Sequence, residues 1–280
     1  METEILQALA EYKDCVTRHN LSAVRRLVEY AATEEYLPEY LEEYPEDERA
    51  EHIEETDEEI AELRRDWTLG KLGWKGSELI TRPEDVLTHW DVYSKRSGLT
   101  GAAFDDRDLE KRSEMMDSYI RGLRDGLQAL GGEAAGLDLP QDFLVLFSKV
   151  DTLEGHKWYE EKDQDRQIVF FTGFLDYDEA KKRVLSDDGL KRNYAYLDGQ
   201  YPDYEHVVAG WKCGDAPEGG CYVIYGRQKL EDEPGWFYHV NKGQFGTEIL
   251  RNVVDLLKWY QEYNVPDDAE VEEACCMLWW

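Results

Sequence analysis

Two carboxylates in the sequence have the spacing of a divalent-metal site. Asp176 and Asp178 flank Tyr177 and follow the apolar stretch QIVFFTGFL. Two carboxylates on one side of the backbone chelate a hard cation, and through it they bind the diphosphate of a sugar nucleotide. In a chain with 62 acidic residues the same triplet arises readily by chance. We therefore keep a metal-dependent, glycosyltransferase-like enzyme as an alternative, and we expect no catalytic residue, no metal and no other cofactor.

The histidines and cysteines do not form a catalytic or metal-binding pattern. None of the six histidines lies in HExxH spacing or beside a GxSxG serine. Cys213 and Cys221 are placed to face each other across a hairpin, but no CxxC pair or histidine is in register with them. The odd count of five cysteines predicts free thiols in a reducing compartment, so we expect a cytoplasmic or nuclear protein.

The charge balance narrows the classes of partner. The formal net charge is −30, from 62 acidic and 32 basic residues. Nucleic acid requires clustered Lys and Arg, and anionic membranes attract basic segments, so we expect neither as a partner. The charge favours steered encounter with a basic protein. The densest acidic run lies between residues 46 and 62, and its candidate steering residues are Glu54, Glu55, Asp57, Glu58 and Glu59.

The two ends of the sequence carry no membrane signal. METEILQALAEY has no basic n-region and no long apolar core, so we do not expect a secretory signal. No stretch of about 18 apolar residues occurs that would span a membrane. The last residues, CCMLWW, lack a cysteine fourth from the end and so lack a prenylation box. We expect this tail to dock in the protein's own groove, or else to anchor a partner or second copy.

The first part of the chain has the periodicity of helices. Apolar residues recur every three or four positions from Ile5 to Tyr12, and again in a second helix that Asn20 or Ser22 would cap. A further helix begins near Pro83, where proline suits the first turn. A strong helix ends at Gly131. Residues 97–107 read as a linker, and residues 46–66 as a solvated helix or an arm that orders on binding.

The second half changes to short, β-branched and aromatic segments. Leu139 precedes a helix that starts with Pro140 and carries Asp142 in its first turn, where a negative charge is favourable. Strands are predicted at 167–172, 206–213, 221–227 and 236–241. Thr247 is predicted to cap a final helix. Helices grouped at the ends of a run of strands indicate an α+β domain.

This order of elements resembles the SUKH superfamily, which contains fungal regulators of cell-wall synthesis and bacterial toxin-immunity proteins. Leu130-Gly131, Leu139-Pro140, Asp142 and Phe143 match its opening pattern, and GWFYHVNKGQFGTEILRNVVDLLKWY matches its late strand and closing helix in kind. The resemblance covers about residues 110–264. It implies a mainly antiparallel sheet flanked by helices and a protein that binds another protein.

We therefore predict an acidic helical region at 1–108, a SUKH-like α+β domain at 109–264 and an apolar tail at 265–280. The predicted function is non-enzymatic binding of a basic protein, in the manner of an immunity protein or of a cell-wall or signalling regulator. Most aromatic residues near the predicted sheet should be core, and outward ones should contact the partner. The candidates are Trp158, Tyr159, Trp211, Trp236 and Tyr238. A mainly helical scaffold is a further alternative.

Overall fold

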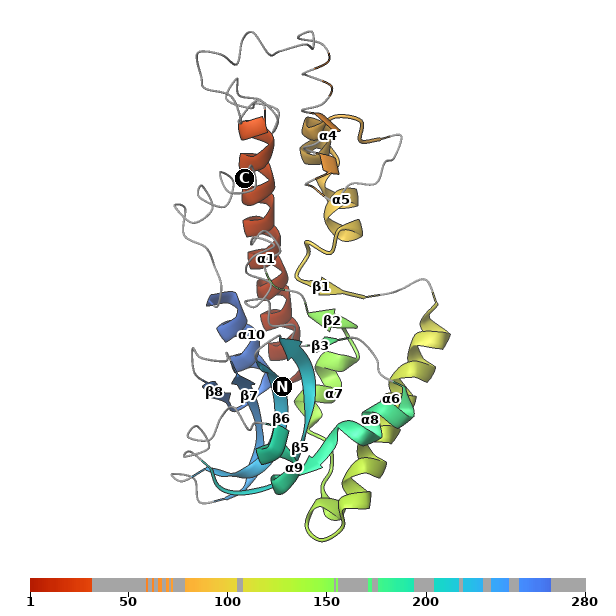
Figure 1. Ribbon diagram of the computed structural model, residues 1–280, viewed down its shortest axis with the longest axis vertical. Coiled ribbons are helices and arrows are strands. Elements are labelled where there is room, and N and C mark those ends of the chain that lie inside the picture. Colours follow the sequence, from red (N-terminus) through yellow and green to blue (C-terminus); the bar gives the residue numbers. More distant parts are fainter. Residues whose placement is uncertain are drawn as a thin grey trace, which may run out of the picture. The chain divides into compact units, whose positions relative to one another are not determined.

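The computed structural model of the chain shows its helices and strands (Figure 1). The described residues are 1–31, 59, 62, 65–66, 69–70, 72, 79–104, 108–153, 155, 171–172, 176–193, 204–216, 219–228, 233–241 and 247–262. They fall into two compact units. The first unit contains Met1–Val16 and Thr100–Val265, and the second contains Thr17–Leu99. The boundaries expected at residues 108 and 264 stay predictions about independent folding.

A single helix, α1 (Glu2–Ala31), replaces the two helices predicted at the N-terminus. The prediction of a break at Asn20 was wrong, because the range contains no Gly or Pro and its apolar spacing continues through this position. Asn20 is buried instead of capping a helix. Its Nδ2 donates a hydrogen bond of 2.9 Å to the carbonyl of Leu99, which satisfies a polar group that is costly to bury alone.

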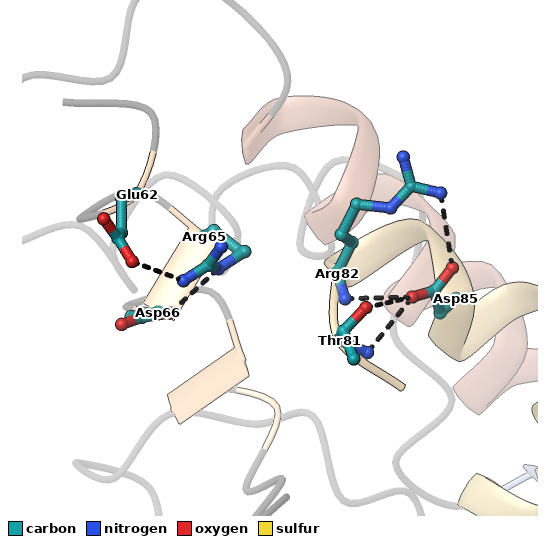
Figure 2. A network of polar contacts seen from close by, with 6 residues as sticks. All are labelled: Glu62, Arg65, Asp66, Thr81, Arg82 and Asp85. Carbon is teal, nitrogen blue, oxygen red and sulfur yellow. Dashed lines mark hydrogen bonds and ion pairs between the residues drawn. The ribbon is translucent and has the colours of Figure 1, made fainter. Parts of the chain in front are cut away.

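The second unit contains two short helices, α4 (Pro83–Thr88) and α5 (Trp90–Arg96). Helix α4 begins at Pro83, as predicted. Asp85 accepts hydrogen bonds from the backbone N–H groups of Thr81 and Arg82, at 3.1 and 3.0 Å (Figure 2). The bond from Thr81 is the largest of the effects that lower the pKa of Asp85. The carboxylate thus accepts hydrogen bonds from N–H groups at the helix start that the helix itself cannot pair.

A second cluster of charged side chains in the same unit joins residues that are close in sequence. Arg65 contacts Glu62 and Asp66, at 3.0 Å each, and all three side chains are substantially exposed (Figure 2). Exposed pairs of this kind add little to stability, because solvent and salt screen them. The hydroxyl of Tyr93, by contrast, is buried and donates to the carbonyl of Leu72 at 2.6 Å. That bond joins residues of this unit that are 21 positions apart.

The first unit is built on an antiparallel sheet in which successive strands pair. The five-stranded sheet has the order β4 (Val184–Ser186), β5 (Tyr204–Ala216), β6 (Gly219–Gln228), β7 (Gly235–Asn241) and β8 (Thr247–Leu250). A smaller sheet joins β1 (Ala102–Ala103), β2 (Thr152–Leu153) and β3 (Phe171–Thr172). The α+β class is confirmed, and the mainly helical alternative is wrong.

The last strand corrects the prediction made for Thr247. Thr247 begins β8 rather than capping a helix, because it and Ile249 are β-branched and pair with β7. The final helix, α10 (Val253–Glu262), starts six residues later and is capped by Asn252. The Oδ1 atom of Asn252 accepts the N–H of Asp255 at 2.9 Å. Asparagine is a stronger N-cap residue than threonine, which explains this start.

Helices cover one face of the five-stranded sheet. They are α6 (Leu109–Leu130), α7 (Gln141–Phe147), α10 and the first turns of α1. Leu139 is buried just before α7, as predicted, although the helix begins one residue after Pro140. The Phe143 ring stacks on Phe147 and meets Trp211 edge-on, with centroids 5.5 Å apart in each pair. The helix that follows the Leu-Pro pair therefore packs on the sheet.

Helix α6 allows an unusually close approach by α8 (Tyr177–Arg183), which lies along it in Figure 1. A Cβ atom at Gly122 would lie 2.5 Å from the carbonyl oxygen of Tyr177. One at Gly126 would lie 2.6 Å from a methyl group of Val184. Both distances are shorter than atoms can adopt, so this helix pair requires glycine at the two positions.

A buried ion pair lies at the C-terminal end of α7. Arg112, at the start of α6, donates to Asp151 at 2.6 Å and to the carbonyls of Phe147 and Val150 at 3.1 and 3.3 Å. The Phe104 ring lies 4.3 Å from its guanidinium carbon. The guanidinium satisfies carbonyl groups left unpaired at the helix end, which removes part of the penalty for burying a charge.

The opposite face of the sheet carries a smaller apolar cluster. Leu190 of α9 (Asp187–Asn193) packs there with Val207, Tyr222, Ile224 and Phe237. Because side chains alternate along a strand, His239 shares this face with Phe237. Its side chain is fully buried, and burial lowers its pKa to about 4. Helix α6 ends at Gly131, as predicted, and a short 3-10 helix, η2 (Ala134–Gly136), follows it.

Among the described residues, no helix has both the length and the apolar character needed to cross a membrane.

Candidate functional site

A groove of about 620 Å³ opens in the first unit between the start of α1 and the start of α10. We call it the α1–α10 groove. Further along the same two helices, Tyr12 packs edge-on against Tyr260, and the Sγ of Cys15 lies 4.0 Å from the carbonyl oxygen of Gln261. The helices therefore touch at one end of their contact and leave a hollow at the other.

The charged side chains that line the groove are mostly acidic. Four carboxylates line it, those of Glu4, Glu11, Asp142 and Asp255. Lys258 is the basic side chain of the lining. Buried Ile5 and Ala8 and half-buried Val254 are also part of the lining. A lining that combines acidic groups with apolar side chains suits a ligand that joins an aliphatic stem to a positive head.

Asp142, which is part of the groove lining, connects three elements. It accepts hydrogen bonds from its neighbour Phe143 N–H, from the Tyr238 hydroxyl and from Val253 N–H, each 2.9 Å long. Val253 is the first residue of α10, so this bond satisfies an N–H group that the helix cannot pair itself. Burial, with Asp142 as a further cause, raises the pKa of Tyr238 well above its ordinary value.

The role predicted for Asp142 was correct but incomplete. The sequence pattern around Pro140 predicted that Asp142 lies in the first turn of α7, and the structure confirms it. Its bonds to Tyr238 and Val253 span 96 and 111 residues and carry no local sequence signal. A single carboxylate therefore fixes where α7, β7 and α10 meet, and so shapes one end of the groove.

Two carboxylates on opposite walls are held in place by amides of their own helices. On α1, Gln7 Nε2 donates to Glu11 Oε1 at 2.9 Å. At the start of α10, Asn252 Nδ2 donates to Asp255 Oδ2 at 2.8 Å. Sequence reasoning missed Glu11, Asp255 and Lys258. The signal was an amide three or four residues before an acid, which places both groups on one helix face.

Glu4 differs from these two carboxylates. Its Oε2 lies 2.9 Å from the Met1 amino group, and this hydrogen bond is the main cause that lowers the pKa of Glu4. Lys149 contacts Glu2 at 3.6 Å nearby. Both pairs are exposed, so neither is a significant source of stability.

The aromatic residues predicted to bind a partner lie mostly in the core or outside the described residues. Trp211 and Tyr238 are fully buried, which corrects their assignment to a binding surface. Strand alternation puts both on the sheet face that α7 covers, so their contact area is used inside the protein. Trp158 and Tyr159 lie outside the described residues.

Among the described aromatic residues that were predicted to bind a partner, Trp236 is partly exposed. Its Nε1 donates to the carbonyl of Asp138 at 2.9 Å, and its ring meets Trp211 and Tyr225 with centroids 5.2 and 5.1 Å apart. The side chain is half-buried at the edge of the core. Its contribution to binding stays a prediction.

Of the five acidic residues predicted to steer a partner, the structure describes Glu59. Glu59 is exposed. Glu54, Glu55, Asp57 and Glu58 lie outside the described residues, and the role of the run stays a prediction.

The two carboxylates with metal-site spacing both have a structural role at the start of α8. Asp176 caps this helix by accepting the N–H of Glu179 at 2.9 Å. Asp178 is exposed in the first turn, where it complements the helix dipole. Tyr177 between them donates to Asp125 of α6 at 2.6 Å. In the part of the chain that the structure describes, no three His, Cys, Asp or Glu side chains are grouped to hold a metal.

Cys213 and Cys221 are adjacent, as predicted from the hairpin. A bulge next to the Gly214–Cys221 pair brings them together, and Cys213 Sγ donates to the Cys221 carbonyl at 3.3 Å. Both are buried free thiols. Burial is the main cause that raises the pKa of Cys221, with Cys213 as a further cause. Such thiols are poor nucleophiles because the thiolate is the reactive form.

Comparison of the chain with models of protein families, with curated proteins and with solved structures found no match. The resemblance to the SUKH superfamily therefore rests on the residues quoted above.

Proposed function

We propose that this chain is a non-enzymatic, SUKH-like protein-binding module and that its partner is a basic protein which contacts the α1–α10 groove. The observation that carries the proposal is the groove itself, whose lining combines four carboxylates with Lys258, Met1 and apolar side chains. The net charge of −30 supports it independently. The proposal includes a cytoplasmic or nuclear location and no binding of nucleic acid.

The charge and the groove contribute to different steps of binding. The net charge acts over about a Debye length, roughly 10 Å at 0.1 M salt, and accelerates encounter with an oppositely charged partner. The groove acts at contact distance, where desolvated apolar area and paired charges slow dissociation. If the chain functions like immunity proteins, the partner is a toxin such as a nuclease with a positive groove. If it functions like regulators, the partner is a cell-wall or signalling protein.

The test uses the full chain and a basic protein captured from the native cell at moderate salt. Association is then measured by stopped flow at 0.1 and 1 M salt for the wild type and for a Glu11→Gln, Asp255→Asn double variant. The control is Glu110→Gln with Glu114→Gln, which removes the same charge from exposed positions on α6.

The expected result is a strong salt dependence of the on-rate for every variant and faster dissociation for the groove variant alone. Equal dissociation of the groove and control variants would place the partner elsewhere on the surface. An on-rate that does not change with salt would contradict the proposal, because a basic partner of so acidic a chain is attracted at long range.

A further inference from the structure

We infer that the α1–α10 groove takes an arginine side chain of the basic partner, with the guanidinium group between Glu11 and Asp255. This inference rests on the proposed function and adds the chemistry of the recognised group. Glu11 and Asp255 come from the two opposing walls, α1 and α10, and both line the groove. A planar cation with donors on several sides can pair with carboxylates on both walls.

The two carboxylates are oriented and keep capacity to accept further hydrogen bonds. Gln7 occupies one oxygen of Glu11, and Asn252 occupies one oxygen of Asp255. An ionised carboxylate offers about four lone-pair sites, so both can accept from a ligand without losing the amide that holds them. This orientation lowers the entropy lost when a cation binds.

Asp142 contributes charge rather than a direct pair. Its two oxygens already accept from Phe143, Tyr238 and Val253, and these bonds hold the fold together. Replacing any of them by a ligand contact would expose a buried donor and cost free energy. Asp142 therefore adds to the attraction for the cation, which pairs with Glu11 and Asp255.

The rest of the lining favours arginine over a small cation. Ile5, Ala8 and Val254 also line the groove; Ile5 and Ala8 are buried and Val254 is half-buried, so the apolar contact for an arginine stem comes chiefly from Val254. The volume of about 620 Å³ is within the range of about 300–1,000 Å³ that ligand pockets have. Guanidinium is less strongly hydrated than ammonium and has five N–H donors, so it loses less on entering and can bridge two acids.

Lys258 tunes this site because it brings a competing positive charge to the same lining. It lowers the attraction for a second cation, and it also prevents the acids from repelling one another when the groove is empty. Its replacement by a neutral side chain of similar length should therefore tighten the binding of a cationic ligand.

The test uses capped alanine peptides that differ at one central residue, which is arginine, lysine or citrulline. Citrulline keeps the shape of arginine and removes its charge. Binding to the full chain is followed by NMR of the methyl groups of Ile5, Ala8 and Val254, which locates the peptide in the groove. We expect the arginine peptide to bind roughly tenfold more tightly than the citrulline peptide, with lysine between them.

Variants of the chain separate the two walls. Glu11→Gln and Asp255→Asn should each weaken the arginine peptide severalfold, and Lys258→Met should strengthen it. The Glu110→Gln control, on α6, should bind like the wild type. Equal affinity for arginine and citrulline, or methyl shifts that are the same in the groove variants and the wild type, would overturn the inference.

The outcome also separates this inference from the proposed function. If the captured basic partner binds with strong salt dependence while the arginine peptide does not shift the groove methyl groups, the inference is wrong and the proposed function stands. If no basic partner is retained and the peptide fails as well, both are wrong.

Discussion

Two helix pairs of the first unit differ in the side chains placed between them. Helices α6 and α8 meet at Gly122 and Gly126, where no space remains for even a methyl group. Helices α1 and α10 meet at Tyr12 and Tyr260 but are separated at their starts by the α1–α10 groove. Glycine lets two backbones approach closely. The first contact therefore leaves no space between its helices, and the second leaves the groove at which we propose that a partner binds.

The largest effect we expect is a loss of folding stability at acid pH. It comes from His239, which is not part of the groove lining. His239 is buried on the far face of the sheet with its pKa lowered to about 4, against an ordinary value of 6.5. Below about pH 6.5 the unfolded chain takes up a proton that the folded chain does not, so stability falls with pH down to about pH 4. At about 1.36 kcal/mol per pKa unit the total loss is about 3 kcal/mol.

The measurement is urea denaturation of the wild type and His239→Phe at several pH values in that window. The variant should lose the part of the pH dependence that comes from this residue. The control is His206→Gln, because His206 is 57% exposed and lies 3.6 Å from Glu133. The same slope in His239→Phe as in the wild type would assign the acid sensitivity to other groups.

The next effect breaks the comparison of the two helix pairs directly. Gly126→Leu places a side chain where Val184 and the Lys181 carbonyl already lie, and it should cost about 2 kcal/mol after the gain in helix propensity. Val254→Leu, which adds one methylene at the groove, should change the free energy of unfolding by less than about 0.5 kcal/mol. Chemical denaturation measures both. Similar losses for the two variants would show that the pairs do not differ in packing.

The smallest effect concerns the acidic start of α8. Asp176→Asn with Asp178→Asn should change stability by no more than about 0.5 kcal/mol, because asparagine caps a helix about as well as aspartate. Partner binding should not change. Turnover of a sugar nucleotide by the wild type in the presence of Mn²⁺, lost in the double variant, would contradict the non-enzymatic proposal.

Elements with local signals were predictable from the sequence. Pro83 and Gly131 mark helix ends that the structure confirms. The β-branched and aromatic composition of 206–213, 221–227 and 236–241 correctly predicted β5, β6 and β7. Errors occurred where one residue type serves two purposes. Asn20 and Thr247 resemble helix caps, but tertiary contacts make the first a buried hydrogen-bond donor and the second part of a strand.

The candidate site was harder to predict than the fold. Glu11 and Asp255 are two among 62 acidic residues, and no local pattern connects them. Their presence in the lining of one groove follows from how α1 and α10 pack, which depends on the whole core. Trp211 and Tyr238 show the opposite error, because residue type indicated binding while alternation and the position of α7 placed both in the interior.

The two walls of the α1–α10 groove come from distant parts of the chain, as the Cys15–Gln261 contact across 246 residues shows for the same pair of helices. Such a contact closes a long loop and is slow to form, so the groove should be among the last features to assemble during folding. A ligand that bridges both walls binds the native state and not the unfolded chain. At 100 times its dissociation constant it would add about 2.7 kcal/mol to stability. Partner binding would then stabilise the contact between α1 and α10, and only fully folded chains would bind the partner.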